Sequence, residues 1–380
     1  MILFYTLISS LFYLCLMIFY RKGIKHIYAP SISKTNSNTF ISVVVCFRNE
    51  EQNLPMLLKG LIEQHYPATN FEILLYNDAS TDGSLALIKN IQAQFKSHQF
   101  ILKDVKIKQG CNSPKKLAIN DAAANSRADL MVVTDADCIL NKDWLSLIES
   151  CYVSQKAFLI AAPVVIKPEA NFINELQGIE MQALTAVTAG AIGNKKALMC
   201  NGANLAFDRK TFLSLDPFKY NHHISSGDDM FLLMSMQEVN ANKIEFLAHS
   251  NAVVHTNGKT NLSSYINQRI RWTSKSKHYE ANGIKIVALL VLNMNAVLLF
   301  SPLVFLAGNL YAGALLFISI LLIKQLADTI CMTAFANKMQ IKVNYSKLLL
   351  YQYLEAALTL LVALKSIKGS YVWKERKQHF

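Results

Sequence analysis

The sequence predicts an α/β protein with a mostly parallel sheet and with membrane helices at both ends. Between about residues 40 and 165, short apolar runs alternate with segments of helical periodicity. This order is typical of a parallel sheet covered by helices. Apolar stretches of near-spanning length lie before and after that region. The hydrophobic content is 52% in a chain of 380 residues, and its excess is concentrated in these stretches.

The α/β elements are expected in a regular order. The pattern predicts buried strands at 41–46, 71–76, 130–133 and 158–165, and amphipathic helices near 50–64, 84–96, 115–125 and 143–153. From 166 onwards the alternation stops, and a helix is expected at 172–190. The sequence contains neither a Gly-x-Gly-x-x-Gly turn nor a Walker lysine loop, which disfavours nicotinamide and P-loop nucleotide sites.

The first 20 residues carry no charge and are long enough to cross a bilayer. Arg21, Lys22 and Lys25 follow directly, so we expect an uncleaved anchor at 1–22 and a cytoplasmic domain after it. A C-terminal membrane region at 284–364 is expected from apolar stretches at 284–307, 310–332 and 345–364, followed by a basic tail at 365–380. Four full spans would put that tail on the side of the membrane opposite the cytoplasmic domain, whereas the positive charge of the tail favours the cytoplasm. The number of apolar stretches and the charge of the tail would agree if one C-terminal stretch were interfacial or re-entrant.

The C-terminal membrane region contains ionisable residues. Lys324 and Asp328 are four residues apart and can pair on a helix, and Glu355 lies in the last stretch. Such residues indicate either a functional site or a pair that faces other helices.

The formal charge of +12 does not require a nucleic-acid partner. Much of it flanks the apolar segments, at 21–25, 269–285 and 365–377, where anionic lipid headgroups explain it. None of the common nucleic-acid-binding motifs occurs, so no nucleic acid is expected. The seven cysteines are odd in number and form no Cys-x-x-Cys pair, which indicates a reduced, cytosolic environment without a zinc site.

Two carboxylates, Asp135 and Asp137, follow the apolar run at 130–133. Adjacent carboxylates repel one another unless a cation neutralises them. Mg²⁺ and Mn²⁺ are commonly held by one or two carboxylates together with substrate phosphates. The end of a parallel strand is also where open α/β sheets bind ligands. The pair therefore indicates a metal–diphosphate site, with a polar turn after a strand as the alternative.

Further polar groups stand at element ends. Arg48, Asn49 and Glu50 follow the first strand, and Asp78 ends the second, where it could accept a hydrogen bond from a base or ribose. Lys115 and Lys116 open a helix and could approach a diphosphate, or are surface lysines.

Two later motifs complete this set. Asp228 and Asp229 precede an apolar run, and two acidic residues exceed what the helix dipole needs. Gln268, Arg271 and Trp272 offer a bidentate phosphate ligand and a flat ring, or else a membrane-interface anchor.

Taken in order, these motifs resemble the family 2 glycosyltransferases, inverting enzymes of the GT-A fold that include membrane-embedded cellulose- and hyaluronan-synthase-like members. The resemblance covers about residues 40–280 and the membrane segments. Ile41–Glu51 looks like the opening strand and its Asn-Glu segment. Asn77–Gly83 is similar to the Asp-Asp-Gly-Ser-Thr-Asp-Gly turn, with Asp78 in the position of the nucleoside-binding aspartate.

The later motifs match as well. Ser113–Lys116 resembles the Gly-Lys segment, with Pro114 replacing glycine and Lys115 in the lysine position. The resemblance implies that Asp135 and Asp137 bind Mg²⁺ or Mn²⁺ and that Asp229 is the catalytic base. Gln268–Trp272 matches the Gln-x-x-Arg-Trp signature. The sequence departs from the family pattern at Asn77, which replaces aspartate, and at Asp228, which replaces glutamate and could shift the acceptor pocket.

The resemblance implies a cytoplasmic GT-A domain at 40–280 in a multi-pass protein of the cell membrane, with room for membrane partner subunits. The expected reaction moves a sugar from a nucleotide-diphosphate sugar, a UDP-sugar by expectation, to a membrane-associated lipid or growing polysaccharide. The expected substrate-binding residues are Arg48, Asn49, Glu50, Asp78, Lys115, Asp135, Asp228, Gln268, Arg271 and Trp272.

Three alternatives stay open at this point: transfer of a single sugar to polyprenyl phosphate or another lipid, a non-catalytic membrane subunit, and a nucleotidyltransferase. The products distinguish them, because glycosyl transfer releases a nucleoside diphosphate, nucleotidyl transfer releases pyrophosphate, and a subunit releases neither.

Overall fold

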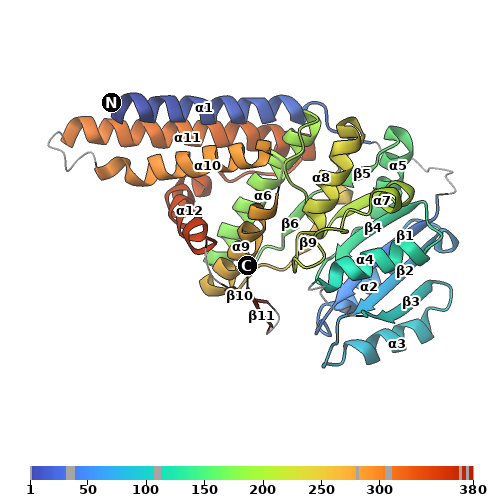
Figure 1. Cartoon of the computed structure of the whole chain (residues 1–380). Coiled ribbons are helices and arrows are strands. Elements are labelled where there is room, and N and C mark those ends of the chain that lie inside the picture. The colour runs from blue at the N-terminus through green and yellow to red at the C-terminus, as the bar shows by residue number, and fades with distance from the viewer. Residues whose placement is uncertain are drawn as a thin grey trace. The chain divides into compact units, whose positions relative to one another are not determined.

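The chain is divided between two units, which we call the sheet unit and the helical unit (Figure 1). The sheet unit comprises Ile27–Lys167 and Lys195–Gly258, and the helical unit comprises Met1–His26, Pro168–Asn194 and Lys259–Phe380. The computed structural model describes residues 2–30, 39–106, 113–279, 282–303, 310–367, 370–373 and 376–379. The segment 40–280, expected to form one domain, is thus shared by the two units, because α6 (Phe172–Gly193) and α9 (Leu262–Thr273) pack on the apolar helices.

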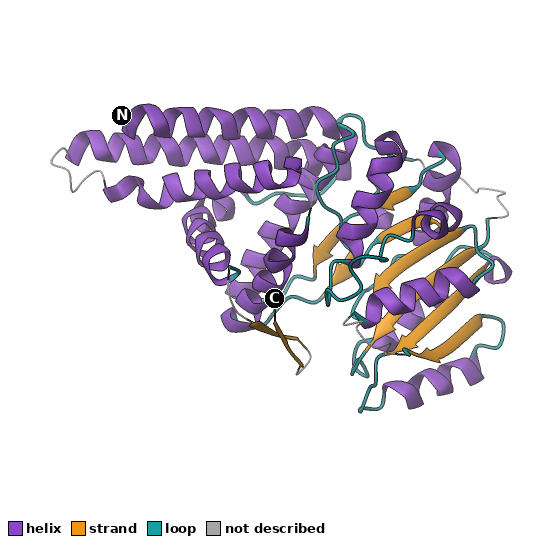
Figure 2. Ribbon diagram, viewed as in Figure 1, coloured by secondary structure: helices purple, strands orange, loops and turns teal. Residues whose placement is uncertain are grey.

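The sheet unit contains a seven-stranded sheet in the order β3-β2-β1-β4-β7-β5-β8 (Figure 2). Its strands are β1 (Ile41–Phe47), β2 (Phe71–Asn77), β3 (Gln99–Asp104), β4 (Leu130–Asp135), β5 (Leu159–Ala161), β7 (Leu205–Asp208) and β8 (Ile244–Phe246). Strands β1 to β4 are parallel, and β7 runs antiparallel to both of its neighbours in this sheet. The expected mostly parallel sheet is confirmed.

One expected strand is divided, and β3, β7, β8 and β9 (Val254–Thr256) were not among the expected strands. The run at 158–165 is divided, because β5 ends before Pro163 and β6 (Val164–Ile166) pairs instead with β9 in a second, small sheet. Strand β3 was not expected from the sequence. It is an edge strand whose side chains are exposed or half-buried, so it carries little hydrophobic signal.

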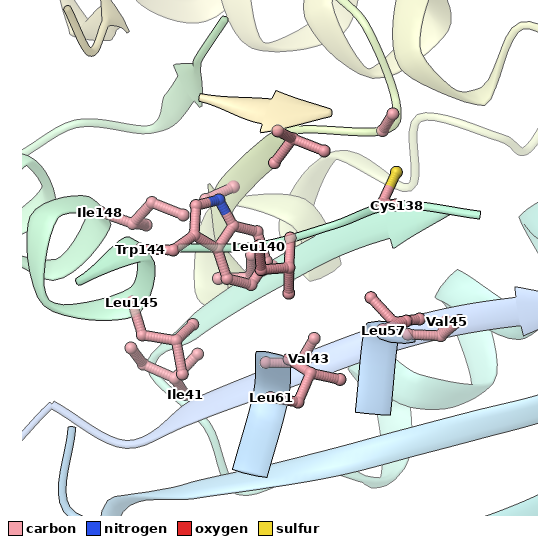
Figure 3. Close-up of a cluster of buried hydrophobic side chains, with 14 of the residues drawn as sticks. Ile41, Val43, Val45, Leu57, Leu61, Cys138, Leu140, Trp144, Leu145 and Ile148 are labelled. Carbon is pink, nitrogen blue, oxygen red and sulfur yellow. The ribbon is translucent and has the colours of Figure 1, made fainter. Parts of the chain in front are cut away.

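Helices cover both faces of the main sheet. The helices of this unit are α2 (Leu54–Ile62), α3 (Ser84–Gln94), α4 (Pro114–Asn125), α5 (Trp144–Gln155), α7 (Arg209–Leu215) and α8 (Asp228–Asn240). Side chains alternate along a strand, and Val43 and Val45 of β1 pack with Leu57 and Leu61 of α2 (Figure 3). On the opposite face of β1, Ser42 hydrogen-bonds Ser126, directly after α4, at 2.6 Å. Helix α4 therefore covers the second face.

The helical unit contains four helices that are long and apolar enough to cross a membrane. They lie within α1 (Ile2–Ile24), α10 (Asn282–Phe300), α11 (Leu310–Met339) and α12 (Tyr345–Lys365), and a short hairpin of β10 (Ser370–Trp373) and β11 (Arg376–His379) follows. The expected stretches are thus confirmed as helices, except that 304–307 lies outside the described residues. Two lysines of the basic tail, Lys368 and Lys374, also lie outside them.

The expected pair of ionisable residues forms in α11. Lys324 is 2% exposed and donates to Asp328 at 2.9 Å. Asp328 also accepts from Tyr13 of α1 and from Gln352 of α12, at 2.5 and 3.0 Å. One carboxylate therefore joins three apolar helices, and buried polar groups of this kind are stable only when they are paired. The pair has a structural role in the bundle.

Candidate active site

The loops after β1 and β2 are joined by hydrogen bonds. Asn49 has a left-handed backbone (φ 52°), and its side-chain oxygen accepts from the backbone N–H of Thr81 at 2.8 Å. Arg48 Nη1 donates to the carbonyl of Asp78 at 3.0 Å. Asp78 itself is only 2% exposed at the end of β2. These bonds fix the position of the loop residues around Asp78.

Glu50 belongs to the same loop but points into another network. Its backbone N–H donates to Ser84 Oγ at 2.9 Å, and its carboxylate accepts from Asn53 Nδ2 at 2.7 Å. Asn53 in turn accepts from Asn257 at 3.0 Å. Through Asn53, Glu50 thus joins the loop to the segment after β9.

The end of β4 and the starts of α4 and α8 meet at Lys115. Cys46 of β1 and Asp135 of β4 are opposite one another in register, on the face covered by α4. Lys115, in the first turn of α4, donates from Nζ to Asp135 Oδ1 at 2.6 Å. The same Nζ lies 3.6 Å from Asp228 Oδ2. We call Lys115, Asp135 and Asp228 the lysine–carboxylate cluster.

The charges in this cluster support one another. Burial alone lowers the pKa of the Lys115 amine, but the carboxylates of Asp135 and Asp228 raise it well above its ordinary value. Burial and the charge of Asp78 also raise the pKa of the neighbouring Cys46 thiol, to about 12. Cys46 is therefore a neutral thiol beside the charged groups of the cluster.

A residue that the sequence did not single out, Gly202, closes this site. Its carbonyl accepts from Lys115 Nζ at 3.3 Å. A Cβ at this position would lie 3.2 Å from both Lys115 Nζ and Asp228 Oδ2, and 3.5 Å from Asp229 Cβ. A side chain here would fit only if Lys115 and Asp228 moved by a few tenths of an ångström. The sequence shows the polar turn Asn201–Asn204 between apolar runs, but it does not show that this turn lies against the carboxylates.

The side chain of Asn204, which is 1% exposed, holds this turn in place. Its Nδ2 donates to the carbonyls of Pro163 and Ala252, each at 2.8 Å, and its Oδ1 accepts from Trp144 Nε1 at 2.9 Å. Because every polar atom of this amide is used, the turn that carries Gly202 has a fixed position.

Asp137 lies two residues beyond Asp135, and its Oδ2 accepts from Thr256 Oγ1 at 3.1 Å. Among the described residues, no group of three or more His, Cys, Asp or Glu side chains is arranged to hold a metal ion. Oxygen donors from two carboxylates fit Mg²⁺ or Mn²⁺, which complete their shell with water and substrate phosphates. Asp135 and Asp137 therefore suit a metal that arrives with a diphosphate, and not a closed structural site.

Asp229 stands in the first turn of α8. The preceding Gly227 has φ 86°, a backbone conformation that favours glycine, and it ends the loop that leads into the helix. Asp229 is half-buried, and its Oδ1 accepts from the backbone N–H of Met230 at 2.8 Å. The glycine turn thus sets the direction in which Asp228 and Asp229 leave the loop.

Lys116 differs from its neighbour Lys115 in its surroundings. It is 1% exposed and therefore is not the surface lysine that was one interpretation of the sequence. Its Nζ donates to Asn221 O and Oδ1 at 2.7 and 2.8 Å and to Ile224 O at 3.2 Å. It also lies 4.4 Å from the centre of the Phe231 ring. Lys116 holds the loop that carries Asp228 and Asp229.

Gln268, Arg271 and Trp272 belong to the helical unit, on α9. The residue between them, Arg269, pairs with Glu180 of α6, which also accepts from Tyr265 at 2.6 Å. The Arg269 guanidinium lies 4.3 Å from the centre of the Trp272 ring and 4.9 Å from that of Tyr265. Burial raises the pKa of Glu180, although Arg269 and Tyr265 oppose the shift. The motif is therefore anchored to α6 through Arg269.

Comparison with known families decides the class of this site. Residues 130–341 match the model described as Glycosyl transferase family group 2, and residues 42–214 match Glycosyl transferase family 2. The chain belongs to the family 2 glycosyltransferases. This membership confirms that the protein is an enzyme, and it leaves the non-catalytic subunit and the nucleotidyltransferase without support.

Two curated relatives of the transferase come from different organisms. It is 27% identical over 239 residues (61% of this chain, 47% of the relative) to Beta-monoglucosyldiacylglycerol synthase of Synechocystis sp.. It is 31% identical over 106 residues (28% of this chain, 32% of the relative) to a dolichyl N-acetyl-alpha-D-glucosaminyl phosphate 3-beta-D-2,3-diacetamido-2,3-dideoxy-beta-D-glucuronosyltransferase of Methanococcus voltae. The chain thus spans less than half of the length of either relative.

The fold of the transferase is shared with a solved structure, the mannosyltransferase PcManGT of Pyrobaculum calidifontis in complex with GDP-Man and Mn²⁺. The two chains superpose with a TM-score of 0.54 at 15% identity, over 97% of this chain and 99% of the other. The GT-A type of α/β fold expected from the sequence is confirmed.

Proposed function

We propose that the transferase moves one sugar from a nucleoside-diphosphate sugar to a lipid acceptor in the membrane, with inversion at the anomeric carbon. The observation that carries this proposal is the lysine–carboxylate cluster. It places a cation, Lys115, between Asp135 at the end of a parallel strand and Asp228 at the start of α8, beside Asp229. The ligand site of an open α/β sheet lies at the carboxyl ends of its strands.

The donor end of the reaction is assigned to the residues around Asp78 and Lys115. Asp78 suits the nucleoside hydroxyls, and Arg48, Asn49 and Glu50 hold the loop beside it. A divalent cation, Mg²⁺ or Mn²⁺, bound by Asp135 and Asp137 would stabilise the leaving diphosphate as a Lewis acid. Lys115 adds a positive charge that can contact the same phosphates. The complex of PcManGT with GDP-Man and Mn²⁺ supports this assignment.

The acceptor end is assigned to Asp229. Inversion in a single displacement needs a base on the side of the sugar opposite the leaving group. Asp229 leaves the same loop as Asp228 and so stands next to the cluster and not within it. As the base, it would take the proton of the acceptor hydroxyl while Asp228 stays paired with Lys115.

The four apolar helices and the relatives support a lipid acceptor. The names of the two relatives include a diacylglycerol and a dolichyl phosphate, both of which are membrane lipids. We infer that the helical unit brings such an acceptor to a cytoplasmic catalytic site, with Gln268, Arg271 and Trp272 of α9 contacting the diphosphate and the acceptor. Arg21 and Lys22 at the end of α1 support the cytoplasmic side.

The test is an incubation of membranes that contain the full-length protein with a panel of radiolabelled UDP- and GDP-sugars. We expect a labelled product in the lipid extract, release of the nucleoside diphosphate, and an anomeric configuration opposite to that of the donor. Membranes with Asp229→Asn should lack the product, whereas Asp216→Asn, an exposed aspartate outside the site, should retain it. A product with retained configuration would reject the role of Asp229, and label confined to the aqueous polymer fraction would reject the lipid acceptor.

A further inference from the structure

Lys115 pairs with a carboxylate that the proposed metal would also need. Its Nζ lies 2.6 Å from Asp135 Oδ1 and 3.6 Å from Asp228 Oδ2, and it donates to the carbonyl of Gly202. The Lys115 side chain is 23% exposed, compared with 45% for Asp135 and 12% for Asp228. The ammonium therefore lies between the most open carboxylate of the cluster and a nearly enclosed one.

This arrangement differs from the ordinary ion pairs of the same unit. Lys103 and Asp121 also form a lysine–aspartate pair, at 2.8 Å, but their side chains are 37% and 44% exposed. In the described part of the chain, Asp121 is the one carboxylate within ion-pair distance of Lys103. Such exposed ion pairs contribute little to the stability of the fold, because water screens their charges. Lys115, in contrast, balances two carboxylates at a strand end, and the charges of both raise the pKa of its amine.

A divalent cation bound to Asp135 would meet this ammonium at close range. The ion would share the Asp135 carboxylate with the Lys115 ammonium, whose Nζ lies 2.6 Å from Oδ1. Like charges on one carboxylate repel strongly in a partly buried site. Asp135 and Asp137 are the two carboxylates assigned to the metal, so the partial loss of one of them weakens binding substantially.

We propose that Lys115 is a resident counter-cation that keeps the affinity of Asp135 and Asp137 for a metal low in the absence of donor and releases Asp135 when a nucleoside diphosphate binds. The inference depends on the proposed function, since it takes Asp135 as a metal ligand. The diphosphate carries several negative charges and is a better partner for the ammonium than one carboxylate. Lys115 would move from Asp135 to the phosphate oxygens, and the freed carboxylate would take the metal.

The consequence is thermodynamic coupling between the two ligands. If the diphosphate raises the metal affinity by some factor, the metal raises the diphosphate affinity by the same factor. Because the mechanism exchanges one full charge at Asp135, we expect a factor of about 10 or more, within the range of about 5–150 typical of coupled sites. The coupling would prevent the site from holding a metal when no donor is present.

The experiment measures Mn²⁺ binding directly, without catalysis. Free Mn²⁺ is quantified by electron paramagnetic resonance for the full-length protein in detergent, with and without UDP or GDP. For the natural sequence we expect weak Mn²⁺ binding that tightens about 10-fold or more when the preferred nucleotide is present. Lys115→Met, which removes the charge but keeps the length of the side chain, should bind Mn²⁺ alone about 10-fold more tightly and lose most of the coupling.

Two further variants serve as controls. Lys115→Arg keeps the positive charge and should keep the low affinity for Mn²⁺ alone. Lys103→Met removes an ion pair outside the site and should behave like the natural sequence. Thermal unfolding of each variant shows that the compared proteins are folded.

The outcomes separate this inference from the proposed function. If the natural sequence binds Mn²⁺ with nucleotide and Lys115→Met binds Mn²⁺ alone no more tightly, the counter-cation role is wrong while the metal site stands. If no protein binds Mn²⁺ even with nucleotide, the metal assignment itself is wrong. If the natural sequence already binds Mn²⁺ tightly without nucleotide, the inference is overturned.

Discussion

Lys116 and Lys115 are adjacent, yet the structure predicts different effects on stability when their charges are removed. Lys116→Met fills a similar volume but removes three hydrogen bonds to Asn221 and Ile224. A hydrogen bond to a charged group contributes about 1.5–3 kcal/mol, so three of them set an upper bound near 4–9 kcal/mol. The desolvation of a buried ammonium offsets several kcal/mol of that sum. We therefore expect a net loss of about 2–4 kcal/mol.

This loss can be measured as a change in melting temperature. For a unit of about 150–250 residues, each kcal/mol corresponds to about 2–4 °C, so Lys116→Met should lower Tm by about 5–15 °C. Differential scanning fluorimetry of the detergent-solubilised protein gives the value, with Lys103→Met as the matched control that should change Tm by no more than about 2 °C. The Tm of Lys115→Met should also stay close to the natural value, because the Lys115 side chain is partly exposed and its nearer partner, Asp135, is 45% exposed and can be hydrated.

A Tm for Lys116→Met within about 2 °C of the natural sequence would contradict this account. It would mean that the loop before α8 keeps its position without the lysine. A second readout addresses the same point: if the loop is displaced, Asp229 is displaced with it, and kcat should fall even at temperatures where the variant is folded.

Four further outcomes are expected. Asp229→Asn should lower kcat by about 10²–10⁴, the usual contribution of a positioned base, while nucleotide binding measured by calorimetry stays nearly unchanged; a larger effect from Asp228→Asn would reverse that assignment. Gly202→Ala should lower kcat by about 10-fold with a Tm loss of only a few degrees, because the new Cβ would displace the lysine–carboxylate cluster by a few tenths of an ångström. Unchanged kinetics would show that this displacement does not affect the reaction. Arg271→Ala should weaken inhibition by the nucleoside diphosphate on matched amounts of inserted protein, whereas a pure interface anchor would leave inhibition unchanged. Burial lowers the pKa of His249 below its ordinary 6.5, although Asp143 opposes the shift. As the pH falls, the unfolded chain therefore takes up a proton before the folded protein does, and Tm should decrease below about pH 6.5. His249→Asn should reduce this dependence of Tm on pH, and an equal slope in both proteins would contradict the role of His249.

The class of the protein, and the place of Asp135 and Asp137 at the end of a strand, could be predicted from the sequence alone. Strands β1, β2 and β4 are buried on both faces, so each is a continuous apolar run that interrupts the helical periodicity around it. Asp135 and Asp137 could be predicted from the same run, because a strand of this kind ends where the polar residues begin. The membrane helices could be predicted in the same way, since length and hydropathy are properties of the chain alone.

Other elements carry too little local signal. Strand β3 lies at the sheet edge and β7 has four residues, and both are placed by their neighbours and not by their own periodicity. The division of 40–280 between two units has the same origin. Helices α6 and α9 are packed against α1, α11 and α12, which are distant in sequence.

The different roles of the two lysines follow from long-range contacts. Residues 115 and 116 are one step apart on α4, so a rotation of about 100° separates their side chains. One faces the end of β4, and the other faces the loop at 221–224, which returns from far along the chain. Gly202 reaches the cluster by the same kind of long-range return. The burial of Lys116, the charge balance at Lys115 and the close approach of Gly202 all depend on contacts between residues that are distant in sequence. No periodicity in the sequence encodes these contacts.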